Sequence, residues 1–100
     1  MKIEITKDKD SMTGRLTGRL DNASVAQFTQ SIETLTAQTG HSVILDCAGL
    51  QFISLRGLQL FRWLQDSVQR QGGHFSMRNV AATIMQILTA TGFATLLNLE

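Results

Sequence analysis

This sequence has no excess of either charge, no second cysteine, no proline and no long apolar run. Nine basic residues nearly balance eight acidic residues and leave a net charge of +1, so we expect no basic surface for a nucleic acid or an anionic membrane. The single cysteine, Cys47, cannot form an internal disulfide, which suits a reducing compartment. No apolar run approaches the roughly 20 residues of a membrane helix, and the first residues contain no apolar signal core. We therefore expect a cytoplasmic protein without membrane insertion.

Residue patterns for catalysis, metal binding and phosphate binding are missing as well. The glycines form neither a GxGxxG nor a GxxxxGK[ST] pattern. His41 and His74, taken with Cys47, do not match a familiar zinc spacing. Ser54 is flanked by Ile53 and Leu55 and does not stand in a Gly-x-Ser-x-Gly elbow, so it has no evident base and is not an evident nucleophile. We predict a non-enzymatic protein with no cofactor and no metal site.

The residues that are present predict a single α/β domain over residues 1–100. Hydrophobic residues make up 43% of the chain and charged residues 17%, as in ordinary globular proteins. Alternating or short apolar runs predict strands over residues 2–6, 12–20, 42–46, 74–78 and 94–99. Apolar residues at helical spacing predict helices over about 25–35, 55–71 and 80–88. The first two strands should form an antiparallel hairpin, and the later alternation predicts a mixed β-sheet with the helices packed on it.

Some residues predict how these elements pack. Gly14 and Gly18 share one strand face with apolar residues, which suggests close packing or a β-bulge. The inner stripe of the second helix is formed by Gly57, Leu60, Phe61, Leu64 and Val68. Trp63 and Met85 fall beside the inner stripes of their helices, so each is either packed at the rim of the core or an exposed contact, and rim packing is the commoner case. Cys47 should be a small buried filler.

Three polar residues have both a structural and a functional interpretation. Ser54 stands where the second helix begins, and capping that helix is its favoured role. Asp46, at the end of a strand, either accepts N–H bonds from the following loop or shapes a recognition surface. Asp21 is either an N-cap for the first helix, with Ser24 as a rival start, or a contact for a partner. The sequence leaves the choice open for both aspartates.

Four segments together resemble a known family. They are Gly18-Arg19-Leu20-Asp21, the segment from Ile44 to Leu50, the segment from Phe52 to Leu58, and Gly92-Phe93. Their order and spacing over nearly the whole chain are similar to those of the STAS domain, the fold of the bacterial anti-sigma factor antagonists (anti-anti-sigma factors). The resemblance implies a non-enzymatic cytoplasmic signalling protein that binds a serine-kinase-type, ATPase-like anti-sigma factor and so regulates transcription. It also implies a switch, in which a phosphate at the start of the second helix ends that protein–protein interaction.

The sequence departs from the family pattern at this switch. Ser54 takes the position before the phosphoacceptor, Leu55 takes the phosphoacceptor position, and Arg56 replaces a small residue before Gly57-Leu58. Leucine cannot accept phosphate. Three outcomes follow: constitutive binding, service in another complex such as an accessory subunit of a membrane transporter, or phosphorylation of Ser54 instead. We rank Ser54 last because one residue rotates a helical side chain by about 100°.

The predicted partner-binding surface combines the turn after the second strand with the start of the second helix. Its residues are Asp21, Asn22, Ser54, Leu55, Arg56 and Gly57. Within it, Leu55 is an apolar anchor and Arg56 a bidentate donor, residue types that contribute strongly to binding.

Overall fold

A four-stranded sheet carries the three α-helices of the protein. The computed structural model covers residues 1–100. Its elements are, in order, β1 (Lys2–Lys7), β2 (Ser11–Leu20), the 3-10 turn η1 (Asn22–Ser24), α1 (Val25–Leu35), β3 (Ser42–Ile53), α2 (Leu55–Arg70), β4 (His74–Arg78), α3 (Ala82–Thr91) and the 3-10 turn η2 (Phe93–Thr95).

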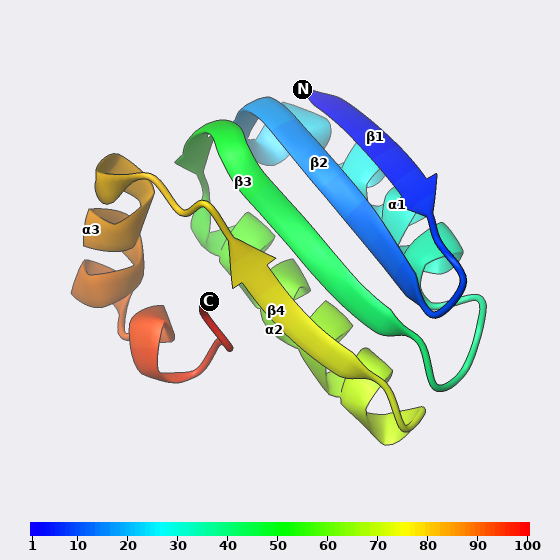
Figure 1. Cartoon of the computed structure of the whole chain (residues 1–100). Coiled ribbons are helices and arrows are strands. Elements are labelled where there is room, and N and C mark those ends of the chain that lie inside the picture. The colour runs from blue at the N-terminus through cyan, green and yellow to red at the C-terminus, as the bar shows by residue number, and fades with distance from the viewer.

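The strands lie in sequence order across the sheet. β1 and β2 form an antiparallel hairpin, while β2–β3 and β3–β4 are parallel pairs. Both α1 and α2 cover one face of the sheet, and α3 lies at the side near β3 (Figure 1). This architecture confirms the predicted α/β class, the N-terminal hairpin and the mixed sheet. None of the helices combines the length and the apolar character that crossing a bilayer requires.

The hydrophobic core lies between the sheet and the two helices that cover it. Phe28 of α1 and Phe61 of α2 meet there with ring centroids 5.3 Å apart, in a tilted arrangement that aromatic pairs favour. Gly14 permits close packing as predicted, because a Cβ at this position would lie only 3.3 Å from Leu45 Cδ2. Cys47 is the buried filler that the sequence predicts, and burial raises the pKa of its thiol to about 12.

The central strand β3 is much longer than predicted. The sequence predicted a strand that ends at residue 46, but β3 continues to Ile53 alongside β2. Two register shifts interrupt the pairing of β2 with β3, one between Arg15 and Thr17 and one between Gly18 and Arg19, and at each of them β3 contributes one residue more than β2. Gly18 adopts φ +102° at the second shift, so the bulge expected near this glycine is present in the pairing, with the extra residue in β3. The polar and glycine residues of β3 obscured the alternation that would have indicated this extension.

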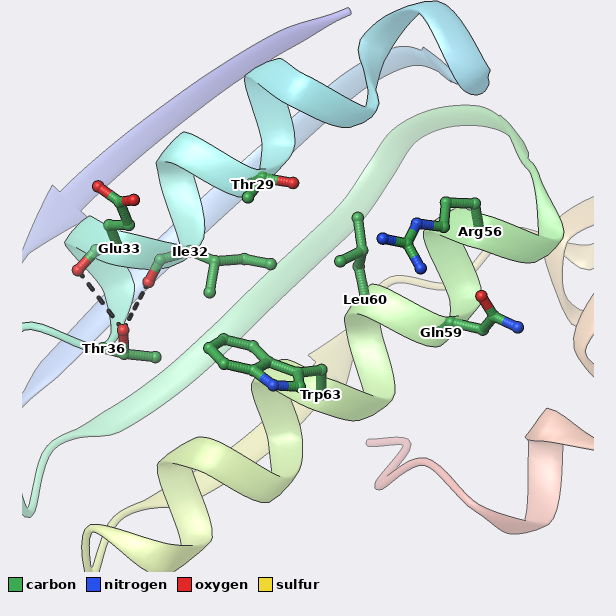
Figure 2. A pocket seen from close by; sticks show the side chains of 8 residues that line it. All are labelled: Thr29, Ile32, Glu33, Thr36, Arg56, Gln59, Leu60 and Trp63. Atoms are coloured by element: carbon green, nitrogen blue, oxygen red, sulfur yellow. Dashed lines mark hydrogen bonds between the residues drawn. The ribbon is translucent and has the colours of Figure 1, made fainter.

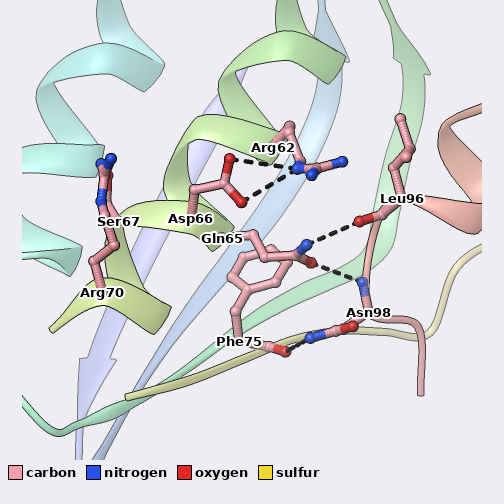
Figure 3. Close-up of polar contacts among 8 residues, drawn as sticks. All are labelled: Arg62, Gln65, Asp66, Ser67, Arg70, Phe75, Leu96 and Asn98. Atoms are coloured by element: carbon pink, nitrogen blue, oxygen red, sulfur yellow. Dashed lines mark hydrogen bonds and ion pairs between the residues drawn. The ribbon is translucent and has the colours of Figure 1, made fainter. Parts of the chain in front are cut away.

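The C-terminal segment is not the strand that the sequence predicted. Residues 93–95 form the turn η2, and only Leu99 makes a single parallel bridge to Met77. The buried side chain of Gln65 holds this segment: its Nε2 donates to the carbonyl of Leu96 at 2.8 Å, and its Oε1 accepts from the N–H of Asn98 at 2.7 Å (Figure 3). Backbone pairing with β4 is limited to Met77, whose N–H donates to the Asn98 carbonyl and whose carbonyl accepts from the Glu100 N–H, so the Gln65 side chain satisfies backbone groups that a longer β-ladder would otherwise pair.

The sheet face away from α1 and α2 carries a row of alternating charges. Glu4, Arg15, Asp46 and Arg78 are successive partners in the register of the four strands, and Arg78 pairs further with Glu100 at 2.9 Å. Asp46 is 8% exposed. It accepts hydrogen bonds from the Ala48 N–H and from Asn79 Nδ2, both at 3.1 Å, and lies 3.6 Å from Arg15 Nε.

These contacts establish the structural role of Asp46. Burial alone would raise its pKa, but the hydrogen bonds from Ala48 and Asn79 and the charges of Arg15 and Arg78 together lower the pKa below its ordinary value. The carboxylate therefore accepts a backbone N–H bond, as in the first of its two interpretations, but the donor Ala48 lies in the extended β3 and not in a loop. Its contribution to a recognition surface stays a prediction.

Replacing Gln65 with alanine should loosen the C-terminal segment. The substitution leaves the Leu96 carbonyl and the Asn98 N–H without their partner, which costs about 1–3 kcal/mol of unfolding free energy. Urea denaturation measures this loss, and hydrogen exchange should show faster exchange of the Asn98 amide. The matched control is Gln69→Ala, on the exposed face of the same helix. Equal stability of the two variants would contradict this role for Gln65.

Replacing Asp46 with asparagine should destabilise the protein in a pH-dependent way. Because the folded-state pKa is lowered, the charged carboxylate stabilises the fold above its unfolded pKa of about 3.9, and this contribution is lost as the pH falls through the folded pKa. Urea denaturation at pH 7 and at about pH 3 should show a large difference between wild type and variant that shrinks in acid. A difference that stays constant or grows on acidification would refute the electrostatic role.

Candidate partner-binding site

The start of α2 is joined to the end of β2 by backbone pairing. Leu20 and Ile53 are the last paired residues of the two parallel strands. One residue further, the N–H of Ser54 donates to the carbonyl of Leu20 at 2.8 Å. The turn that begins at Asp21 therefore leaves the sheet next to the point where α2 begins. The two segments that the sequence assigned to one surface lie side by side.

Ser54 is the N-cap of α2. Its backbone is extended, with φ −80° and ψ 166°, and its Oγ accepts a hydrogen bond from the N–H of Gly57 at 3.1 Å. This is the usual way in which serine satisfies a free amide of the first helical turn. The capping role predicted for Ser54 is confirmed.

Gly57 allows α2 to begin directly against the ends of the strands. A Cβ at this position would lie 2.9 Å from Ile53 Cγ1 and 2.9 Å from Leu20 Cδ2, which is too close for any side chain without movement. Gly57 is buried as a result. Its role in the predicted surface is to support the exposed residues that precede it.

Leu55 and Arg56 are the exposed residues of this helix start. Leu55 is 58% exposed and is the most exposed of the large hydrophobic residues, ahead of Trp63 and Leu96. Arg56 forms no ion pair or side-chain hydrogen bond, whereas each of the other arginines contacts a side chain: Arg15–Asp46, Arg19–Phe52, Arg62–Asp66, Arg70–Ser67 and Arg78–Glu100. An apolar side chain and a free guanidinium thus project from the tip of α2 with no role in the fold.

The adjoining turn presents Asp21 and Asn22. Asp21 Oδ1 accepts from the Ala23 N–H at 3.1 Å and lies 3.3 Å from Ser24 Oγ, and it caps η1. The helix α1 itself begins after Ser24. Of the two predicted starts, Asp21 therefore precedes the 3-10 turn η1 and Ser24 precedes the α-helix. Asn22 is exposed. Contact of either residue with a partner stays a prediction.

Sequence analysis missed a groove between α1 and α2. It has a volume of about 470 Å³ and is lined by Thr29, Ile32, Glu33, Thr36, Arg56, Gln59, Leu60 and Trp63 (Figure 2). Rim packing, expected for Trp63 and Met85, is found only for Met85, since Trp63 is 51% exposed. Leu60, predicted to be inside, is only partly buried, while Leu58 is fully buried. The position of Trp63 beside the inner stripe was the available signal for the groove.

Comparison with known proteins gives a consistent result. The family model of the STAS domain matches residues 2–100. No curated protein matches the sequence significantly. Among solved structures, an anti-sigma factor antagonist from Mycobacterium paratuberculosis superimposes with a TM-score of 0.86 at 14% identity, covering 99% of this chain and 84% of that chain.

Two further structures share the fold. The Bacillus anti-sigma factor antagonist SpoIIAA, in its unphosphorylated form, gives a TM-score of 0.79 at 19% identity and covers 99% of this chain and 88% of its own. The murine anion transporter Slc26a9 gives 0.77 at 19% identity, over 94% of this chain and 16% of the transporter. Since the family model spans all but the first residue, the chain belongs to the STAS domain family.

Proposed function

We propose that this protein is a non-enzymatic, cytoplasmic interaction module of the anti-sigma factor antagonist type. In this proposal it binds a serine-kinase-type anti-sigma factor and so regulates transcription. The binding surface is the start of α2 together with the adjoining turn, namely Asp21, Asn22, Ser54, Leu55, Arg56 and the supporting Gly57. The exposure of Leu55 carries the proposal, because 58% of this leucine faces solvent at a position where the fold gives it no packing role.

The chemistry of the helix tip supports binding to a protein. Leu55 offers apolar area that a partner can remove from water, and Arg56 offers a guanidinium without an intramolecular partner. Arginine is enriched at binding hot spots and binds carboxylates in a bidentate way, and a leucine that leaves water on binding adds hydrophobic free energy. The tip is also firmly held, because Ser54 caps the helix and Gly57 seats it on the strands. A preorganised surface loses less conformational entropy on binding.

The same residues support a constitutive interaction. SpoIIAA is known in an unphosphorylated and a phosphorylated form, and the sequence pattern aligns Leu55 with the family's phosphoacceptor. A leucine side chain has no oxygen to phosphorylate. The change of nearly two charge units that a phosphate would bring therefore cannot occur at this position. The hydroxyl of Ser54 already accepts the Gly57 N–H. Phosphorylation of Ser54 ranks below constitutive binding, because one residue along the helix start rotates the side chain by about 100° from the direction of the family's acceptor.

A second candidate function is that of an accessory subunit in a membrane transport complex. The similarity to a segment of Slc26a9, a transporter in which the matched part is 16% of the chain, supports it. The helix tip would then contact another protein of that complex. Genes next to this one distinguish the two functions, since one predicts a kinase-like regulator and the other a transporter.

Replacing Leu55 with glutamate should disrupt binding to the cognate anti-sigma factor. The change removes the apolar anchor and places a carboxylate in the interface, and we expect a loss of at least about 2 kcal/mol, or roughly 30-fold in Kd. Isothermal titration calorimetry measures the affinity. Leu96→Glu is the matched control, because Leu96 is also an exposed leucine (46%) and lies near the C-terminus. Equal affinity of the two variants would place the interface elsewhere.

Restoring a phosphoacceptor should restore the switch. Incubation with the cognate kinase and ATP should leave the wild type unmodified and bound, whereas Leu55→Ser should take up one phosphate and dissociate. Intact-protein mass spectrometry and size-exclusion chromatography follow the two events. Stoichiometric phosphate on Ser54 of the wild type would refute the constitutive interaction.

A further inference from the structure

The two walls of the groove between α1 and α2 present matching rows of residues. On α1 the row is Thr29, Ile32, Glu33 and Thr36, and on α2 it is Arg56, Gln59, Leu60 and Trp63. Both rows have the spacing i, i+3, i+4, i+7, so each is one continuous helix face. Figure 2 shows the two faces turned toward each other, with Leu60 and Ile32 between them.

The groove is larger than a packing defect. Its volume of about 470 Å³ falls in the range of 300–1,000 Å³ that is typical of ligand sites. Ile32, which is 3% exposed, and the partly buried Leu60 form the apolar part of its lining. Trp63 forms one end of the groove and is half exposed. Tryptophan is enriched at interfaces and is among the residues most enriched at binding hot spots.

The charges on the walls are free to interact with an occupant. Arg56 on α2 has no ion pair, and Glu33 on α1 has none either, although most charged residues of the sheet face are paired. Arg56 and Trp63 are separated by seven residues, or about 10 Å along the helix axis. A fitting occupant therefore carries a carboxylate and a large apolar side chain about two helical turns apart.

We propose that this groove receives an amphipathic helix of the protein partner, with an acidic residue against Arg56 and an apolar residue against Trp63. This inference rests on the proposed function and extends the interface from the tip of α2 along two turns of the helix. Arg56 belongs to both surfaces, so one partner can occupy them together. An amphipathic helix in a groove uses anchors at i, i+3, i+4 and i+7, so its acidic residue against Arg56 and its apolar residue against Trp63 can lie on one face, seven residues apart.

The composition of the protein allows a direct test. Trp63 is the only tryptophan, so the protein labelled with 5-fluorotryptophan gives a single fluorine NMR resonance. Addition of the cognate anti-sigma factor should shift this resonance and abolish its sensitivity to deuterated solvent. In calorimetry, Trp63→Ala should weaken binding at least about tenfold. Gln69→Ala, exposed on the same helix outside the groove, should leave the Kd unchanged.

The outcomes separate this inference from the proposed function. If the anti-sigma factor binds in a Leu55-dependent way while the fluorine resonance and the Trp63→Ala affinity stay unchanged, the groove is not part of the interface and only the proposed function stands. If the anti-sigma factor does not bind at all, both fall. A resonance that shifts with the concentration of the protein alone assigns the groove to a second copy of this chain and overturns the inference.

Discussion

The contact between the start of α2 and the ends of β2 and β3 determines where the proposed binding surface lies. The helix packs so closely at Gly57 that a Cβ at this position would lie 2.9 Å from side-chain atoms of Leu20 and Ile53. The hydrogen bond from Ser54 to the Leu20 carbonyl ties the same point to β2. Because the helix is fixed at its first turn, Leu55 and Arg56 face outward and cannot fold back onto the core. Exposure of these two residues is a consequence of close packing beneath them.

Most of the fold could be predicted because its signals are local. Alternating residues defined the hairpin, and helical spacing with a glycine after each helix defined α1, α2 and α3. The extension of β3 beyond Asp46 could not be predicted, since β3 stays paired with β2 through two register shifts that interrupt its own alternating pattern. The prediction of a last strand over residues 94–99 was wrong for a similar reason. Two backbone groups of this segment bond to the side chain of Gln65, and only Met77 of β4 pairs with it; these are long-range contacts that no local pattern encodes.

The candidate site shows the same division. The residues at the helix tip were found from the sequence because a strand followed by a serine-capped helix places them at one edge of the sheet. The sequence interpretation assumed that Asp21 and Ser54 lie close together. The hydrogen bond from the Ser54 N–H to the carbonyl of Leu20, the residue before Asp21, brings these two segments side by side. The groove could not be found, because it depends on how α1 and α2 lie relative to each other over the Phe28–Phe61 pair. Trp63 was noticed only as a residue outside the inner stripe.

Hydrogen exchange at the first turn of α2 tests the central claim most directly. The amides of Leu55 and Arg56 have no acceptor within the helix and should exchange rapidly in the free protein. On binding the anti-sigma factor, we predict strong protection of residues 55–57, equal with and without ATP. Unchanged exchange of these amides in a demonstrated complex, or protection that ATP abolishes, would contradict a constitutive interface at the tip of α2.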